Sequence, residues 1–372
     1  MNVKTMYQRG VDTPIERIEV GVYTVPTDAP EADGTYAWDS TTLVLVEATG
    51  GDRRGVGYTY ADSATARLIT ESLVAAVVGT EAMAVPAAWA AMAQKVRNLG
   101  KPGIAAMAIA AVDNALWDLK ARLLDIPLVT LLGPVRAGVD VYGSGGFTSY
   151  DDRQLRDQLG GWVASGIPRV KMKIGTHPDD DLRRVRVARE AIGPDAQLFV
   201  DANGAYSRKQ ALAFAEAFTD LGVTWFEEPV YHHDHEGLRL LRDRGPAGMD
   251  IAAGEYAYDT EYFRRLLDAG AVDVLQADAT RCMGITGLLQ AAALCEAHFL
   301  ALSAHCAPSI HAHPGCAILP MRHLEYFHDH ARIEQMLFDG VLTPRDGALY
   351  PDLARPGNGL EFKHADAARY AV

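Results

Sequence analysis

The chain has 372 residues, of which 49% are hydrophobic and 22% are charged, and this composition is typical of a folded protein rather than a disordered one. Lys and Arg number 35 against 48 Asp and Glu, so the net charge of −13 argues against nucleic acids and anionic membranes as partners. The longest strongly apolar run, 104–112, falls short of the roughly 20 residues that span a bilayer. The first residues lack the apolar core of a secretory signal, and the four cysteines form no CxxC pair, so we expect free thiols and a cytoplasmic location.

Residues 1–135 predict a small α+β domain. Alternating apolar and polar residues and a Gly-rich turn indicate strands over 15–25, 41–50 and 55–61. Helices are expected over 63–78, 81–98 and 104–124. Gly133 and Pro134 end this part of the chain.

From Val139 onward, short apolar runs alternate with helical stretches. The eight runs begin at residues 139, 169, 197, 223, 250, 271, 300 and 323. Regular alternation of strand and helix requires parallel strands, because parallel neighbours need a crossover connection. Eight such units favour closure into a (β/α)8 barrel over an open sheet.

Ionisable residues occupy most of the predicted strand ends, which is where barrels of this kind carry their chemistry. Asp201, Glu227 and Glu255 end the third, fourth and fifth strands, and neighbouring strands lie roughly 4.8 Å apart. Three carboxylates that close repel one another unless a cation neutralises them. An all-oxygen ligand set suits Mg²⁺ or Mn²⁺, so we predict one such ion here, with ordinary polar loop starts as the alternative.

Two nitrogen bases are predicted to flank this metal. Lys171 and Lys173 lie two residues apart on one strand, and two adjacent ammonium groups beside a metal lower each other's pKa, which could give a neutral lysine base. Asp278 and His305 end the sixth and seventh strands, so the carboxylate can orient the imidazole. The two bases would reach Cα of a metal-bound carboxylate substrate from opposite faces, and the cation would stabilise the enediolate. Glu325, on the eighth strand, could donate a hydrogen bond to that carboxylate if it stays protonated.

Several motifs together resemble the enolase superfamily, specifically its mandelate racemase subgroup. They are KMKIG (171–175), VDANG (200–204), WFEEP (225–229), GE (254–255), DATRCMGITG (278–287), SAH (303–305) and LEY (324–326). The resemblance covers essentially the whole chain. It implies an α/β fold with a modified (β/α)7β TIM-type barrel over 136–345, an N-terminal α+β capping domain over 1–135, and a segment over 346–372 that returns to the cap. It also implies a homo-oligomer, from dimer to octamer.

The resemblance further implies a role for each site residue. Mg²⁺, one per chain, would be bound by Asp201, Glu227 and Glu255. Lys173, tuned by Lys171, would serve one face of the substrate and His305, paired with Asp278, the other. Glu325 would hold the substrate carboxylate, with Ser144 and Asn203 as substrate or metal neighbours. Capping segments near 24–38 and 55–62 are expected to close the site. Tyr36, Trp38, Tyr58 and Tyr60 are candidate contacts there, and plain packing is the more common role for each such side chain.

Histidines are concentrated after two of the predicted strands. His232, His233 and His235 follow the fourth strand, and His311 and His313 follow the seventh. Both segments are expected at the mouth of the barrel. Hydrogen bonding to a polyhydroxylated substrate, a second metal site and a plain surface role all remain open for them.

The preferred hypothesis is the dehydration of an acid sugar, an aldonate or aldarate, to a 2-keto-3-deoxy acid. The same two bases would also permit racemisation or epimerisation of a 2-hydroxy acid, and cycloisomerisation of a lactone is a third option. A catalytically silent protein that binds sugar acids is the non-enzymatic alternative. No dinucleotide fingerprint, P-loop or GxSxG nucleophile motif is found in the sequence.

Overall fold

The computed structural model describes residues 13–372. The first residues, for which no secretory signal is expected, lie outside this range. The N-terminal part of the described chain holds an antiparallel sheet of β1 (Arg17–Ala32), β2 (Ala37–Gly50) and β3 (Arg53–Tyr60). The three expected strands are present, but β1 and β2 extend further into a long hairpin. The register of this hairpin shifts between Pro26 and Glu31, so its far half departs from the simple alternation that identified the near half.

The helices of this cap are α1 (Ala64–Leu68), a π-helical turn (Ile69–Leu73), α2 (Val74–Val77), α3 (Val85–Lys95), α4 (Ile104–Leu123) and α5 (Leu128–Leu132). The Ala-rich α4 lies directly on the sheet. Glycines in β3 allow this approach, because a Cβ at Gly57 would lie 2.2 Å from the backbone nitrogen of Ala115. Small residues on both elements therefore bring the helix and sheet backbones together.

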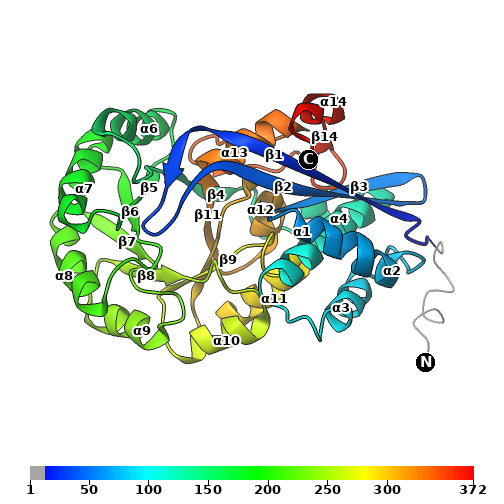
Figure 1. Cartoon of the computed structure of the whole chain (residues 1–372), viewed down its shortest axis with the longest axis horizontal. Coiled ribbons are helices and arrows are strands. Elements are labelled where there is room, and N and C mark those ends of the chain that lie inside the picture. Colours follow the sequence, from blue (N-terminus) through cyan, green and yellow to red (C-terminus); the bar gives the residue numbers. More distant parts are fainter. Residues whose placement is uncertain (1–12) are drawn as a thin grey trace.

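A closed parallel barrel follows the cap (Figure 1). Its strands, in chain order, are β4 (Val139–Gly145), β5 (Arg169–Lys173), β6 (Gln197–Asp201), β7 (Val223–Glu227), β8 (Asp250–Ala253), β9 (Val274–Ala277), β10 (Ala301–Ala304) and β11 (Met321–Phe327). Pairing of β11 with β4 closes the ring. Each predicted apolar run overlaps one of these strands, and the expected fold of a capped TIM-type barrel is confirmed.

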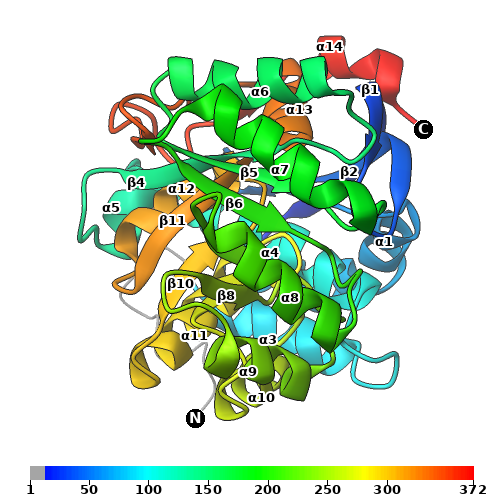
Figure 2. The same cartoon turned by 90° about the vertical axis from the view of Figure 1, so that its left-hand side faces the viewer.

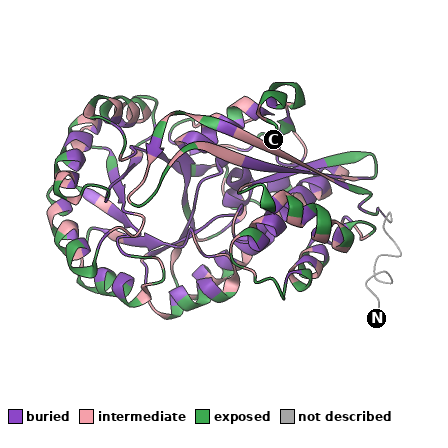
Figure 3. Ribbon diagram, viewed as in Figure 1, coloured by how far each residue is buried: buried purple, intermediate pink, exposed green. Residues whose placement is uncertain are grey.

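Helices surround the barrel on its outside (Figure 2). They are α6 (Asp152–Ala164), α7 (Pro178–Ile192), α8 (Arg208–Thr219), α9 (His235–Arg244), α10 (Thr260–Asp268), α11 (Gly284–Ala297), α12 (Pro308–Ala317) and α13 (His328–Leu337). Figure 3 shows buried strands inside a ring of helices whose outer faces are exposed. The eighth strand also has a helix, α13, which the (β/α)7β expectation does not include.

The end of the chain runs back from the barrel to the cap. Strand β12 (Phe338–Asp339) pairs with β14 (Glu361–Phe362), and β13 (Ala348–Leu349) pairs with β4. After α14 (His364–Ala367) and a 3₁₀ turn (Ala368–Tyr370), the backbone nitrogen of Val372 donates to Val22 of β1 at 3.1 Å. Within residues 13–372 we find no helix with the length and apolar character needed to cross a membrane.

Candidate functional site

Three carboxylates converge at the carboxyl ends of neighbouring barrel strands. Asp201 and Glu227 are the last residues of β6 and β7, where they are paired in register, and Glu255 follows β8. One oxygen of each lies within 4.8 Å of the others, and all three side chains are buried. The Oε2 atom of Glu255 has no hydrogen-bond partner among the described residues. This donor set of buried oxygens fits a hard divalent cation such as Mg²⁺.

Burial and mutual repulsion set the charge of this group. Burial and the neighbouring Asp201 raise the pKa of Glu227 to about 8, although the two lysines oppose this. Burial would raise the pKa of Asp201 as well, but Lys173 and Lys171 lower it to about 2. A cation that binds here would lower the pKa of Glu227, because it favours the ionised carboxylate.

The two lysines of β5 are buried among these carboxylates. Lys171 Nζ lies 2.5 Å from Glu227, 2.8 Å from Glu325 and 3.3 Å from Asp201, and Lys173 Nζ lies 2.5 Å from Asp201. Burial by itself would lower the pKa of both lysines, yet the carboxylates hold both well above the ordinary value. The carboxylates therefore outweigh the expected lowering of the lysine pKa by the neighbouring ammonium group. A neutral lysine at this position requires a cation that takes up the carboxylate charge.

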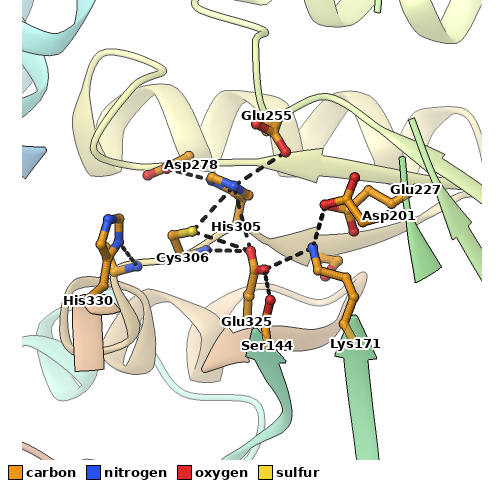
Figure 4. A network of polar contacts seen from close by, with 12 residues as sticks. Ser144, Lys171, Asp201, Glu227, Glu255, Asp278, His305, Cys306, Glu325 and His330 are labelled. Carbon is orange, nitrogen blue, oxygen red and sulfur yellow. Dashed lines mark hydrogen bonds and ion pairs between the residues drawn. The ribbon is translucent and has the colours of Figure 1, made fainter. Parts of the chain in front are cut away.

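His305 lies on the other side of the carboxylate group (Figure 4). It directly follows β10, and its Nδ1 lies 2.9 Å from Oδ2 of Asp278, which follows β9. Burial would raise the pKa of Asp278, but the hydrogen bond to His305 holds it well below the ordinary value, so this carboxylate stays ionised. The second ring nitrogen, Nε2, faces the carboxylates at 3.4 Å from Glu255 and 3.6 Å from Glu325. Asp278 thus fixes the imidazole and leaves Nε2 available.

Glu325 lies between the lysine side and the histidine side of the site. Its Oε1 accepts hydrogen bonds from Ser144 Oγ at 2.5 Å and Lys171 Nζ at 2.8 Å, and Oε2 accepts from the backbone nitrogen of Cys306 at 3.1 Å. Burial would raise the pKa of Glu325, but Lys171 and His305 hold it well below its ordinary value. The expected protonated state is therefore not the resting state, because Lys171 stabilises the anion.

The remaining predicted neighbour, Asn203, lies beside Asp201. It has a left-handed backbone, with φ of 46°, and its backbone nitrogen donates to Asp201 Oδ1 at 2.9 Å. Its side-chain Oδ1 is buried and has no hydrogen-bond partner in the part of the chain that is described. The backbone of Asn203 thus positions Asp201, a candidate metal ligand, and its side-chain oxygen is a hydrogen-bond acceptor that a substrate could use.

Two residues of the site have no assigned role in the sequence prediction. Arg281 Nη1 lies 3.3 Å from Oε1 of Glu255, and its guanidinium lies over the ring of Tyr256 at 5.3 Å. Cys306 Sγ lies 3.3 Å from Nε2 of His305. An arginine or a cysteine does not by itself indicate a place in an active site. The sequence signal that could have indicated it is that each lies within three residues of a strand-end residue.

The tip of the β1–β2 hairpin covers one side of the barrel mouth (Figure 1). The backbone oxygen of Asp33 accepts hydrogen bonds from Thr148 at 2.9 Å and Thr176 at 2.6 Å, in the loops after β4 and β5. Trp38 packs edge-on against Phe147 with ring centroids 5.6 Å apart. Tyr36, by contrast, is 69% exposed and stacks on Trp38. The hairpin therefore lies where the segment 24–38 was expected to close the site.

Tyr58 is a packing residue rather than a candidate substrate contact. Its ring is fully buried, and its hydroxyl donates to Glu334 of α13 at 2.6 Å, inside the junction between cap and barrel. Tyr60 stacks on His330 with ring centroids 3.5 Å apart. Both residues lie on β3, and their contacts with Glu334 and His330 join this end of the strand to α13.

The expected position of His311 and His313 at the mouth of the barrel is wrong, because α12 turns both side chains into the protein. They are 0% and 1% exposed, and they accept hydrogen bonds from the backbone nitrogens of Ala279 at 2.8 Å and Val129 at 3.2 Å. The histidines after β7, His232, His233 and His235, lie against aromatic rings instead. Burial and the neighbouring His233 lower the pKa of His232 to about 4, so that it is neutral at pH 7.

We expect a substitution at the hairpin tip to loosen the contact with the barrel. A Cβ at Gly34 would lie 2.3 Å from the backbone oxygen of Ala202 and 2.6 Å from that of Ile174. Gly34→Ala should therefore lift the hairpin and lower the free energy of unfolding by about 1–3 kcal/mol. Amide hydrogen exchange over 24–38 measures the effect. Gly248→Ala is the control, because a Cβ there meets nothing within 4 Å. Unchanged exchange in Gly34→Ala would refute the close contact.

Comparison with known families and structures agrees with this geometry. Residues 17–133 match the mandelate racemase / muconate lactonizing enzyme N-terminal domain, and residues 154–367 match the enolase C-terminal domain-like family. A crystal structure of a mandelate racemase/muconate lactonizing enzyme-like protein from Rubrobacter xylanophilus is 57% identical, with a TM-score of 0.95, and the match covers 96% of this chain and 100% of that one.

Two further relatives have names that state a reaction. A 3,6-anhydro-alpha-L-galactonate cycloisomerase of Streptomyces coelicolor is 30% identical over 96% of this chain and 99% of its own length. The structure of L-talarate dehydratase from Polaromonas sp. JS666, complexed with Mg and L-glucarate, is 28% identical with a TM-score of 0.86, and the match covers 97% of this chain and 98% of that one. Relatives are thus acid-sugar dehydratases and cycloisomerases, and magnesium is bound in solved structures of the family. The chain belongs to the enolase superfamily, in its mandelate racemase subgroup.

Proposed function

We propose that this protein catalyses the Mg²⁺-dependent dehydration of an acid sugar, an aldonate or aldarate, to a 2-keto-3-deoxy acid. The observation that carries this proposal is the pair of proton carriers on opposite sides of the buried carboxylate group. Lys173 lies against Asp201 at 2.5 Å, and His305 lies against Glu255 at 3.4 Å. Removal of a proton and departure of a hydroxyl need one base and one acid, placed around the same carbon atoms.

Asp201, Glu227 and Glu255 are the residues that would hold Mg²⁺. When bound, the ion supplies positive charge that attracts the substrate carboxylate and stabilises the negative charge that develops on it as the α-proton leaves. Arg281, 3.3 Å from Glu255, keeps that carboxylate in place, and Asn203 does the same for Asp201 through its backbone nitrogen. These contacts are of the kind that orient metal ligands.

In this proposal Lys173 Nζ takes the proton from Cα. Lys171, two residues away, stays protonated because it pairs with Glu227 and Glu325. Its positive charge favours the neutral form of Lys173 once the charge of Asp201 is neutralised. Glu325 is ionised at rest; in this proposal it takes up a proton from solvent when the substrate carboxylate binds beside it, and it donates that proton in a hydrogen bond while Ser144 holds its Oε1 at 2.5 Å.

His305 then acts as the acid. Its Nε2 donates a proton to the β-hydroxyl, so that the bond from Cβ to oxygen breaks and water leaves. The electron pair from the broken bond between Cα and hydrogen forms the double bond between Cα and Cβ. The resulting enol takes a proton at Cβ, loses the proton of its hydroxyl on Cα, and becomes the keto acid. Asp278, at 2.9 Å from Nδ1, stabilises the protonated imidazole before this step.

Cycloisomerisation is the second candidate, favoured by the cycloisomerase relative that is 30% identical over 96% of the chain. The roles of Lys173 and His305 would be the same. The group that leaves Cβ would be a ring oxygen that stays attached to the product, and no water would be released. The two reactions therefore differ in the leaving group that the mouth of the barrel accepts.

The test incubates the full chain with Mg²⁺ and a panel of aldonates, aldarates and their lactone and anhydro forms, in D₂O. Dehydration predicts a keto acid that has lost one water relative to an open-chain substrate. A keto acid that is an isomer of its substrate apart from deuterium taken up from the solvent, formed only from cyclic substrates, would establish cycloisomerisation instead. Inversion or exchange at Cα with no keto acid from any substrate would overturn both and indicate a racemase or epimerase.

A further inference from the structure

A second cluster of ionisable side chains lies outside the candidate active site, where the β1–β2 hairpin meets α13. We call Asp28, Glu31 and His328 the hairpin–barrel cluster. One ligand-type atom of each lies within 4.8 Å of the other two. Asp28 and Glu31 belong to the far half of β1, and His328 is the first residue of α13. Figure 1 shows β1 passing beside α13, so the cap and the barrel both contribute to the cluster.

Glu31 provides the observation that points to a ligand. Its side chain is 1% exposed, and the indole nitrogen of Trp38 donates to its Oε2 at 2.8 Å. Its other oxygen, Oε1, has no hydrogen-bond partner among residues 13–372. A buried polar atom without a partner destabilises the fold, and more so when it is charged. Because Trp38 occupies Oε2, Oε1 is the oxygen that remains to contact a ligand.

The charges around Glu31 are unbalanced in the negative direction. Asp28 and the buried Asp329 lie close to it, and Arg332 is the cation that faces them. Arg332 is engaged by Asp329 at 2.5 Å and by the backbone oxygen of Pro26 at 2.7 Å. Burial, with Asp329 adding to it, raises the pKa of Glu31 to about 8. An added positive charge would therefore stabilise this group.

We propose that the hairpin–barrel cluster is a site for a borderline divalent metal ion of the Zn²⁺ class, which joins the hairpin to the barrel. An imidazole nitrogen with two carboxylates suits zinc, whereas the all-carboxylate group in the barrel suits Mg²⁺. Three protein ligands leave a fourth position for water. Ligand atoms around zinc lie about 3.4 Å apart, and Asp28, whose side chain is 46% exposed, can rotate to reach that spacing.

The test measures Zn²⁺ binding to the full chain in excess Mg²⁺, by competition with a chromogenic chelator. Loss of one ligand in His328→Gln should weaken Zn²⁺ binding by about 100-fold or more. Glu31→Gln should weaken it as well, and this variant keeps an acceptor for Trp38, so the fold is maintained. The matched control is His298→Gln, because His298 pairs with Asp268 at 3.7 Å outside the cluster.

Anomalous scattering at the zinc edge locates the ion and separates this site from the barrel. A peak between Asp28, Glu31 and His328, together with slower amide exchange over 26–32 when Zn²⁺ is added, supports the proposal. Zn²⁺ found only at the barrel carboxylates or beside His305 would overturn it. So would equal Zn²⁺ affinity of the wild type and His328→Gln.

Discussion

Replacement of His305 by asparagine is expected to lower the rate of keto acid formation by about 10²–10⁴-fold, which is the usual contribution of a general acid. Exchange of the substrate α-proton with D₂O should persist in this variant, because Lys173 lies on the opposite side of the carboxylate group. The physical reason is the division of labour between the two nitrogens. His305 Nε2, held through Nδ1 by Asp278 at 2.9 Å, can reach the leaving group, and Lys173 can reach Cα.

The complementary variant is Lys173→Met, which should lose both keto acid formation and α-proton exchange. His298→Asn serves as the control, because His298 pairs with Asp268 at 3.7 Å where α10 and α11 end, and this variant should leave both rates unchanged. Measurement of exchange by proton NMR and of keto acid by semicarbazide gives the two rates separately. Loss of exchange in His305→Asn, with exchange retained in Lys173→Met, would reverse the proposed roles of acid and base.

Replacement of Lys171 by methionine is expected to destabilise the fold by about 3–5 kcal/mol, because one partner of a buried ionic group is removed. Lys171 is 0% exposed and contacts Asp201, Glu227 and Glu325 within 3.3 Å. Methionine keeps most of the volume and removes the charge. Chemical denaturation in the presence of a chelator measures the loss. Lys95→Met, at an exposed position, is the control and should have little effect.

The destabilisation of Lys171→Met should depend on pH and on Mg²⁺. Without the ammonium group, the pKa of Glu227 rises further above its ordinary value, and the pKa values of Asp201 and Glu325 lose a contact that holds them low. The folded variant then binds more protons than the folded wild type, so its deficit in stability grows as pH rises through these folded pKa values. Added Mg²⁺ should restore part of the loss. A variant whose deficit is the same at pH 5 and pH 8, and with or without Mg²⁺, would contradict the proposed charge balance.

Most of the barrel can be predicted from the sequence, because a parallel strand buried on both faces must be apolar and its end must be polar. The runs that contain Asp201, Glu227 and His305 show this directly, and these residues lie at the carboxyl ends of their strands as expected. Adjacent strands then bring these side chains together without further information. The contacts among the strand-end residues follow from topology alone.

Features that depend on orientation or on the sum of many charges could not be predicted in this way. His311 and His313 follow a strand, but the rotation of α12 determines that they face inward. The pKa of Lys171 depends on three surrounding carboxylates rather than on the neighbouring lysine, and distances within the fold decide this. The position of Tyr58 depends on how the cap docks on α13, which strand patterns do not specify.

Anomalous scattering from crystals soaked in Mn²⁺, which takes the same oxygen ligands as Mg²⁺, tests the central claim most directly. The account predicts a strong peak bounded by oxygens of Asp201, Glu227 and Glu255, with Lys173 and His305 on either side, and loss of this peak in Asp201→Asn. A soaked crystal with no peak among these three carboxylates, or a peak of equal height in Asp201→Asn, would contradict it.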